Sequence, residues 1–174
     1  MTSIEIPNGV LVEAKGSEVV IKGKLGQVIK HFNGKYVRID VKDGKANVTA
    51  VDNKKLKRKA MLAETAFSSE LKDTMETVQK GIEQKMKLMF AHFPMSVEVK
   101  GNTIYLKNVF GEKVPREAMI IGSTKVEIKG QDFLIKGIDR YEIGQTIANI
   151  RKACYARGYD TRVFQDGVYI VTEE

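Results

Sequence analysis

The chain contains one stretch twice: VEAKGSEVVIKGKLG (residues 12–26) returns 85 positions later as VEVKGNTIYLKNVFG (residues 97–111). The two copies align without a gap, and most of the positions that differ exchange similar residues. Each copy is typical of two short strands joined by a tight turn at Lys-Gly-Ser or Lys-Gly-Asn. Glycine tolerates the positive φ that such a turn needs, and Ser or Asn can bond to the adjacent backbone.

The match continues downstream with a small change of offset. Residues 39–42 correspond to residues 126–129, and Val48, Val51 and Asp52 correspond to Ile135, Ile138 and Asp139. Since a set of strands followed by one helix occurs twice, the sequence predicts an internal duplication. We expect an α+β fold of two tandem homologous domains, residues 1–81 and 82–174, each with a mostly antiparallel β-sheet packed against one main α-helix.

The composition of the 174 residues limits the classes of protein to consider. The single cysteine, Cys154, excludes an intrachain disulfide and suits a reducing cytosol. No apolar run approaches the roughly 20 residues that a membrane span needs, and the N-terminal residues lack the pattern of a signal peptide. The formal net charge of +7 and the pI near 9.4 favour a polyanionic partner such as nucleic acid.

Alternating polar and apolar residues between turn signals predict the strands. In the first half these are residues 3–6, 10–14, 18–22, 28–29, 36–41 and 46–51. In the second half they are residues 85–91, the repeated hairpin, 125–129 and 132–136, followed by a last hairpin of 162–164 with 168–171. Residues 108–118 are expected to form a loop.

The first helix is expected to be capped by Asp52 or Asn53. Its apolar residues recur every three or four positions and form one face: Leu56, Ala60, Ala63, Phe67, Leu71, Met75, Val78 and Ile82. Its start carries five cations and no acid, Lys54, Lys55, Lys57, Arg58 and Lys59, which oppose the helix dipole. Contact with an anion such as phosphate would compensate this repulsion, and a solvated run of charge is the alternative.

The second helix is expected to begin at a capping box formed by Asp139 and Glu142, in which Glu142 reaches back to the cap. Ile143, Ile147, Ile150 and Cys154 form its apolar face, and Gly158 suits its C-cap.

The sequence shows no pattern for catalysis. His31 and His92 have no metal-ligand neighbours at a suitable spacing, Cys154 lies on an apolar helix face, and no phosphate-binding glycine loop occurs. We therefore expect no enzyme activity, no metal, no cofactor and no small-molecule substrate. The patterns of single-strand RNA readers are also absent, which leaves recognition of folded RNA by its shape and phosphates.

Several segments resemble the universal L-six family of large-subunit ribosomal proteins, and particularly its archaeal and eukaryotic branch. The resemblance rests on AHFP (91–94), NVFGEK (108–113), the helix start at 139–144 and FQDGVY (164–169). The bacterial branch carries Pro-Tyr-Lys-Gly-Lys-Gly after the second helix, whereas this chain has CYARGY at 154–159. Detailed RNA contacts are therefore not transferred from bacteria.

The resemblance implies a cytoplasmic, structural constituent of the large ribosomal subunit. It implies binding to large-subunit rRNA near the sarcin–ricin loop, with neighbouring ribosomal proteins and translational GTPases close by and no membrane. The rRNA contacts that it implies are Lys107, Asn108, Phe110, Gly111, Glu112, Lys113, Arg116, Arg151, Lys152 and Arg157. The basic run at the start of the first helix adds possible phosphate contacts on the ground of its charge: Lys54, Lys55, Lys57, Arg58 and Lys59. A non-ribosomal scaffold that binds an acidic protein is the alternative.

Overall fold

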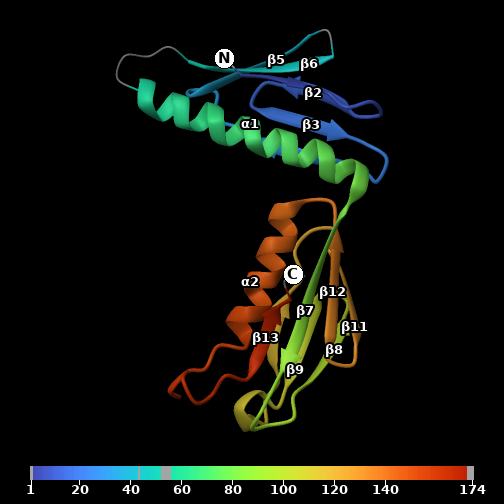
Figure 1. The fold of residues 1–174 in the computed structure, drawn as a ribbon, viewed down its shortest axis with the longest axis vertical. Coiled ribbons are helices and arrows are strands. Elements are labelled where there is room, and N and C mark those ends of the chain that lie inside the picture. The colour runs from blue at the N-terminus through green and yellow to red at the C-terminus, as the bar shows by residue number, and fades with distance from the viewer. Residues whose placement is uncertain (1, 43, 52–55, 172–174) are drawn as a thin grey trace. The chain divides into compact units, whose positions relative to one another are not determined.

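The computed structural model describes residues 2–42, 44–51 and 56–171, which form mostly antiparallel sheets and two α-helices (Figure 1). This arrangement confirms the predicted α+β class. The chain divides into two units, Met1–Gly81 and Ile82–Glu174. No helix within the described ranges is long and apolar enough to cross a membrane.

The first unit has two three-stranded sheets, and the second unit also has two sheets, whereas one sheet was predicted for each. One has the order β1 (Thr2–Glu5), β6 (Lys45–Ala50), β5 (Val37–Lys42), and the other has the order β2 (Leu11–Lys15), β3 (Glu18–Lys22), β4 (Gln27–His31). The helix α1 (Lys57–Lys80) contacts strands of both sheets (Figure 1). Val19, Ile21, Val48, Leu71 and Val78 are fully buried between these layers.

The helix α1 begins later than predicted. Its N-cap is Leu56, which provides no side-chain cap hydrogen bond, and the predicted caps Asp52 and Asn53 lie outside the described residues. The apolar face is otherwise as predicted, since Ala60, Phe67, Leu71, Met75 and Val78 are buried. Gly81 ends the helix at a positive φ, so Ile82 belongs to the next strand rather than to the helix face.

The second unit repeats this plan and adds one strand. Its four-stranded sheet has the order β11 (Lys125–Lys129), β12 (Asp132–Gly137), β7 (Ile82–Met89), β13 (Gly167–Ile170). Its three-stranded sheet has the order β10 (Arg116–Met119), β9 (Thr103–Lys107), β8 (Ser96–Lys100). The helix α2 (Arg140–Ala153) contacts strands of both, and a short 3₁₀ turn, η1 (Val109–Gly111), follows β9.

The strand registers of the two units follow the sequence repeat. Val12 pairs with Ile21 across β2 and β3, and their counterparts Val97 and Leu106 pair across β8 and β9. Ile39 pairs with Val48 across β5 and β6, and their counterparts Val126 and Ile135 pair across β11 and β12. Equivalent positions in the sequence therefore occupy equivalent positions in the sheets.

Two predicted segments of the second unit differ in the structure. The predicted loop 108–118 is interrupted, because Arg116–Met119 forms β10 and pairs with β9. The predicted last hairpin is absent from the described chain, because β13 pairs with β7 and residues 162–164 form no strand. The strand β10 was missed because its residues do not alternate clearly between polar and apolar. The last hairpin was wrong because the partner of β13 is distant in sequence.

The ends of α2 are partly as predicted. Asp139 caps the helix by accepting a hydrogen bond from the Tyr141 N–H at 2.9 Å. The Glu142 carboxylate accepts from the Ser123 N–H at 2.8 Å and thus ties the helix to a neighbouring loop. The helix ends at Ala153 with Cys154 as C-cap, so the predicted C-cap Gly158 lies beyond it.

The alternation of β12 gives a stability test. Ile135 is fully buried whereas its neighbour Leu134 is half-buried on the opposite face. We expect Ile135→Ala to lower the free energy of unfolding by about 2–5 kcal/mol, because it leaves a cavity in the core. Leu134→Ala is the control and should have a clearly smaller effect in urea unfolding. Equal losses would contradict the assigned register.

Candidate nucleic-acid interface

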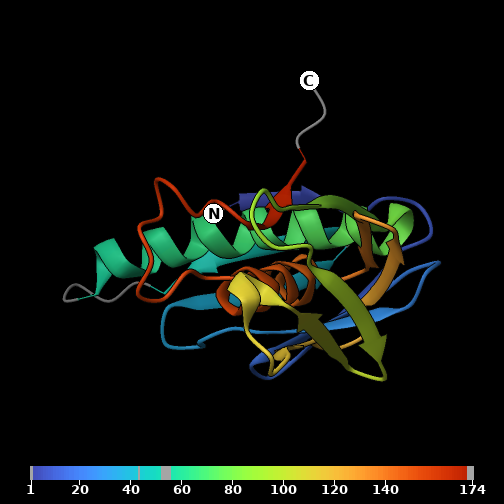
Figure 2. The same cartoon turned by 90° about the horizontal axis from the view of Figure 1, so that it is seen from below.

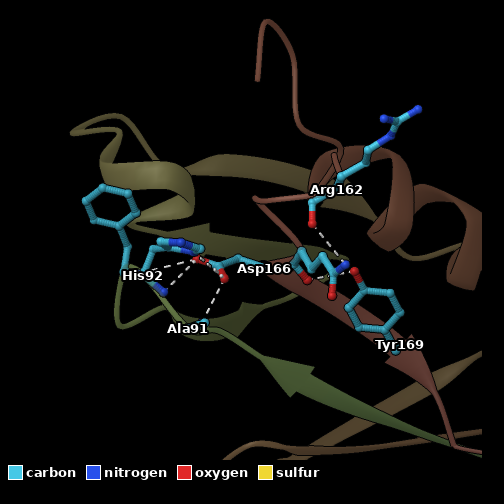
Figure 3. A network of polar contacts seen from close by, with 7 residues as sticks. Ala91, His92, Arg162, Asp166 and Tyr169 are labelled. Carbon is cyan, nitrogen blue, oxygen red and sulfur yellow. Dashed lines mark hydrogen bonds and ion pairs between the residues drawn. The ribbon is translucent and has the colours of Figure 1, made fainter. Parts of the chain in front are cut away.

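Asp166 joins two segments that are far apart in the sequence. Its side chain, 1% exposed, accepts hydrogen bonds from the backbone N–H groups of Ala91 at 2.8 Å, His92 at 3.3 Å and Phe93 at 3.4 Å (Figure 3). The ring Nδ1 of His92 lies 3.4 Å from the same carboxylate. These contacts fix the turn after β7 against the segment that enters β13.

Burial by itself would raise the pKa of Asp166, but the hydrogen bonds from Ala91, His92 and Phe93 outweigh burial and lower this pKa. The carboxylate is therefore ionised at neutral pH. A buried anion with several backbone donors resists separation, since each donor would lose a charge-assisted bond.

Aromatic rings extend this junction toward η1. The rings of His92 and Phe164 lie 4.8 Å apart, and Phe110 lies 6.3 Å from Phe164 and stacks on Tyr159 at 5.3 Å. A Cβ on Gly111 would come within 3.1 Å of the Phe93 ring. We call the loop 108–113 the elbow. Its backbone is thus supported by aromatic rings that Asp166 holds in place.

The backbone of the elbow is strained. Asn108 has φ of 59° and Phe110 has φ of 51°, a region that L-residues other than Asn rarely adopt. The Asn108 Nδ2 donates to the Pro94 carbonyl at 2.9 Å, and the Phe110 side chain is buried. Phe110 was predicted as an RNA contact, but its ring packs in the core and is not available to stack on a base.

Arg116 was also predicted as an RNA contact and has a different role in the structure. Its guanidinium binds both carboxylate oxygens of Glu112, at 2.8 and 2.6 Å, and donates to the carbonyls of Ala153 at 2.9 Å and Tyr155 at 2.8 Å. Its side chain is 17% exposed. Arg116 therefore fastens the elbow to the C-terminal end of α2.

The other charged residues in and beside the elbow differ in whether they form ion pairs. Lys107 Nζ pairs with Glu98 at 2.7 Å. The hydrogen bond from Arg116 lowers the pKa of Glu112, with the charges of Arg116 and Arg157 adding to this effect. Glu112 thus orients Arg116, which donates to both of its carboxylate oxygens. Lys113 is exposed and forms no ion pair with any residue that the structure describes.

Figure 2, seen from below, shows η1 (yellow) beside α2, in agreement with the contacts of Arg116. The structure thereby brings the exposed cations of the elbow and of the end of α2 to one part of the second unit. We call this set the basic tip: Lys113, Arg151, Lys152 and Arg157. Gly111, exposed and at φ of 80°, leaves the backbone of the elbow open to a close approach.

Sequence reasoning missed three exposed residues of the segment that follows α2. Tyr155, Tyr159 and Arg162 alternate with small and basic residues there, and all three are exposed. Figure 3 shows the guanidinium of Arg162 pointing away from Asp166. The mixture of aromatic and basic residues in CYARGYDTR could have indicated these residues, because it is more typical of a nucleic-acid contact than of a helix C-cap.

The basic run of the first unit is only partly described. Lys54 and Lys55 lie outside the described residues, while Lys57, Arg58 and Lys59 are exposed in the first turn of α1, which contains no acid.

The described residues do not support a metal site or a reactive thiol. In the described ranges, no group of three or more His, Cys, Asp or Glu side chains could hold a metal ion. Burial raises the pKa of Cys154 to about 11, so this thiol is protonated at neutral pH and is not a nucleophile. It packs in the core as predicted.

Sequence comparison relates this chain to one family of known proteins. The sequence model of the family described as Ribosomal protein L6 matches residues 93–167. The large ribosomal subunit protein uL6 of Methanosarcina mazei is 41% identical over 169 residues, which cover 97% of this chain and 94% of the relative. This chain belongs to the ribosomal protein L6 family. The uL6 proteins of Picrophilus torridus and Archaeoglobus fulgidus are each 39% identical and cover 98% and 97% of this chain, and 93% and 87% of their own lengths.

The family assignment confirms the resemblance found in the sequence. Because the L6 family is structural and not enzymatic, the prediction that this chain is not an enzyme is also confirmed. The matched residues 93–167 include the elbow, Arg116, α2 and Asp166.

Asp166→Asn tests the buried carboxylate. The amide cannot accept all of the backbone hydrogen bonds, so we expect unfolding at pH 7 to require about 1–3 kcal/mol less. The folded-state pKa is lowered, so the contribution of the carboxylate is present above its unfolded pKa, about 3.9, and is lost as the pH falls through the folded value. Urea unfolding at pH 7 and pH 3 should show the two proteins converging. Asp132→Asn, at an exposed position, is the control, and an undiminished difference at pH 3 would refute the assignment.

Arg116→Lys tests the fastening of the elbow. Lysine cannot bind Glu112 through two parallel hydrogen bonds and also reach two carbonyls. We expect faster hydrogen exchange at the Glu112 amide, which bonds to the Val109 carbonyl, and a loss of about 1–3 kcal/mol in stability. Arg151→Lys, on the exposed side of α2, should leave both quantities unchanged. Unchanged exchange in Arg116→Lys would show that the elbow is held by other contacts.

Proposed function

We propose that this chain is a structural constituent of the large ribosomal subunit in the cytoplasm and binds large-subunit rRNA through the basic tip of its second unit. The observation that carries the proposal is the extent of similarity to proteins named large ribosomal subunit protein uL6, which covers nearly the whole chain. Family membership favours this function over a scaffold for an acidic protein.

The charges of the basic tip support a phosphate contact. Lys113, Arg151, Lys152 and Arg157 are exposed, and none has an ion pair within the described part of the chain. Such cations can neutralise phosphates and release counterions, which is the main source of affinity for nucleic acid. Lys107 and Asn108 stay in the proposed contact as donors at the edge of the elbow, whereas Phe110, Glu112 and Arg116 support it from within.

Within the ribosome, we propose that the second unit docks near the sarcin–ricin loop and the site where translational GTPases bind, with other ribosomal proteins as neighbours. This finer location rests on the resemblance to the family. The rigidity of the elbow is consistent with it, because shape recognition of folded RNA requires a preformed surface.

We also propose that the two units are homologous domains, residues 1–81 and 82–174, that arose by duplication. The shared strand order and the matching registers support this origin. In the first domain, Lys57, Arg58 and Lys59, with Lys54 and Lys55, are proposed as additional phosphate contacts. Lys57, Arg58 and Lys59 lie in the first turn of α1 and oppose the positive end of its dipole, and a bound phosphate would relieve this repulsion.

Lys113→Glu combined with Arg157→Glu tests the basic tip. A charged hydrogen bond contributes about 1.5 kcal/mol, so we expect the Kd for large-subunit rRNA to rise about tenfold for each lost contact. The slope of log K against log salt should fall by about 1 for each contact. Filter binding over a range of KCl concentrations measures both.

Lys100→Glu is the matched control. Lys100 lies in the same hairpin as Lys107 but at the opposite end, so its reversal should change little. If Lys113→Glu with Arg157→Glu binds with unchanged affinity and slope, the basic tip is not the rRNA contact.

A further inference from the structure

A hollow of about 760 Å³ lies beside the junction at Asp166, on the second unit. Its lining includes Lys87 on β7, Gln131 in the β11–β12 turn, Thr161, Gln165 and Asp166, and Tyr169 on β13. Its volume falls in the range of about 300–1,000 Å³ that is typical of sites for small organic groups.

Tyr169 forms one wall of the hollow. The residue is 44% exposed, and its hydroxyl donates to the Gln165 carbonyl at 2.7 Å (Figure 3). The Gln165 side chain in turn donates to the Arg162 carbonyl at 3.2 Å. The ring is therefore held in one orientation while part of its surface stays open, so stacking on it costs little conformational entropy.

Lys87 stands next to Tyr169 on the neighbouring strand. The two residues are register partners across β7 and β13, and both face outward because Leu88 and Val168 beside them are buried. Lys87 is exposed and has no hydrogen bond or ion pair with the residues described, although Asp132 is its partner on β12. A free cation thus lies beside a fixed aromatic ring.

The carboxylate at the floor of the hollow already accepts hydrogen bonds from the protein itself. Asp166 accepts three backbone N–H groups, so its charge is compensated within the protein. Gln131 and Thr161 are exposed and can donate and accept hydrogen bonds at the rim. The hollow therefore combines an aromatic face, polar groups and one exposed lysine that forms no ion pair with the described residues.

We infer that this hollow binds an unpaired nucleotide of the RNA that the basic tip contacts, with the base stacked on Tyr169 and a phosphate on Lys87. The inference rests on the proposed rRNA binding and adds a second contact to it. Base stacking on an aromatic side chain and a lysine for the adjacent phosphate are the two elements that single-stranded nucleotides require. A peptide added to the edge of β13 would need neither the free lysine nor the open ring face.

The test compares Tyr169→Ala and Lys87→Gln with the unchanged protein in filter binding to large-subunit rRNA. Tyr169→Ala should weaken binding about tenfold, as expected for the loss of one stacked base. Lys87→Gln should reduce the salt slope by about 1. Tyr169→Phe, which keeps the ring but loses the hydroxyl, should retain most of the affinity. Ultraviolet cross-linking followed by mass spectrometry should attach RNA to the peptide that contains Tyr169.

Two controls match these variants. Tyr141→Ala removes an exposed tyrosine in the first turn of α2, and Lys129→Gln removes an exposed lysine on β11; both should bind like the unchanged protein. A melting temperature close to that of the unchanged protein should accompany Tyr169→Ala.

The possible failures are distinguishable. If Tyr169→Ala and Lys87→Gln bind rRNA normally while Lys113→Glu with Arg157→Glu does not, the nucleotide site is refuted and the basic tip stands. If Tyr169→Ala binds rRNA normally but loses a protein neighbour in assembled subunits, the hollow binds protein and the inference is wrong. If the unchanged protein does not bind rRNA, both proposals fail.

Discussion

The buried carboxylate of Asp166 is the contact on which the structure around the elbow of the second unit depends. It gathers the backbone N–H groups of residues 91–93, and the rings that follow, His92, Phe93 and Phe164, support the elbow. Without this anion three backbone N–H groups of the turn after β7 would lose their acceptor, and the rings would lose their common anchor. A strained left-handed Phe110 is tolerated because its ring is buried against these neighbours.

The charged residues of the elbow divide into those that build it and those that remain free. Arg116 and Glu112 pair with each other, and Arg116 also donates to two carbonyls at the end of α2. These bonds hold the elbow and the helix together. This arrangement places Lys113 in the same region as the cations of α2 without using any of them as structural links. A basic surface composed of two separate segments therefore acts as one preformed unit.

Much of the fold could be predicted from the repeat, because hydrophobic alternation specifies both strands and register. Val126 and Ile135 were aligned with Ile39 and Val48 before any pairing was known, and the sheets pair them accordingly. The site could be predicted less well. Phe110 and Arg116 look like RNA contacts in a basic, glycine-containing loop, but distant partners such as Tyr159 and Tyr155 determine their burial. One sequence does not reveal such long-range contacts, and for the same reason β13 was paired with the wrong segment.

Because the structural charges and the exposed cations are different residues, salt should affect the shape of the elbow and the binding of RNA differently. Interactions between exposed charges and phosphates weaken as ionic strength rises, whereas partly buried pairs are screened much less. Arg116 is mostly covered and its partners include two uncharged carbonyls, so the elbow should keep its shape at salt concentrations that release RNA. Binding would then be reversible without unfolding: salt removes the attraction of the free cations but leaves the scaffold that presents them. A surface built from mutually dependent exposed ion pairs would lose affinity and shape together.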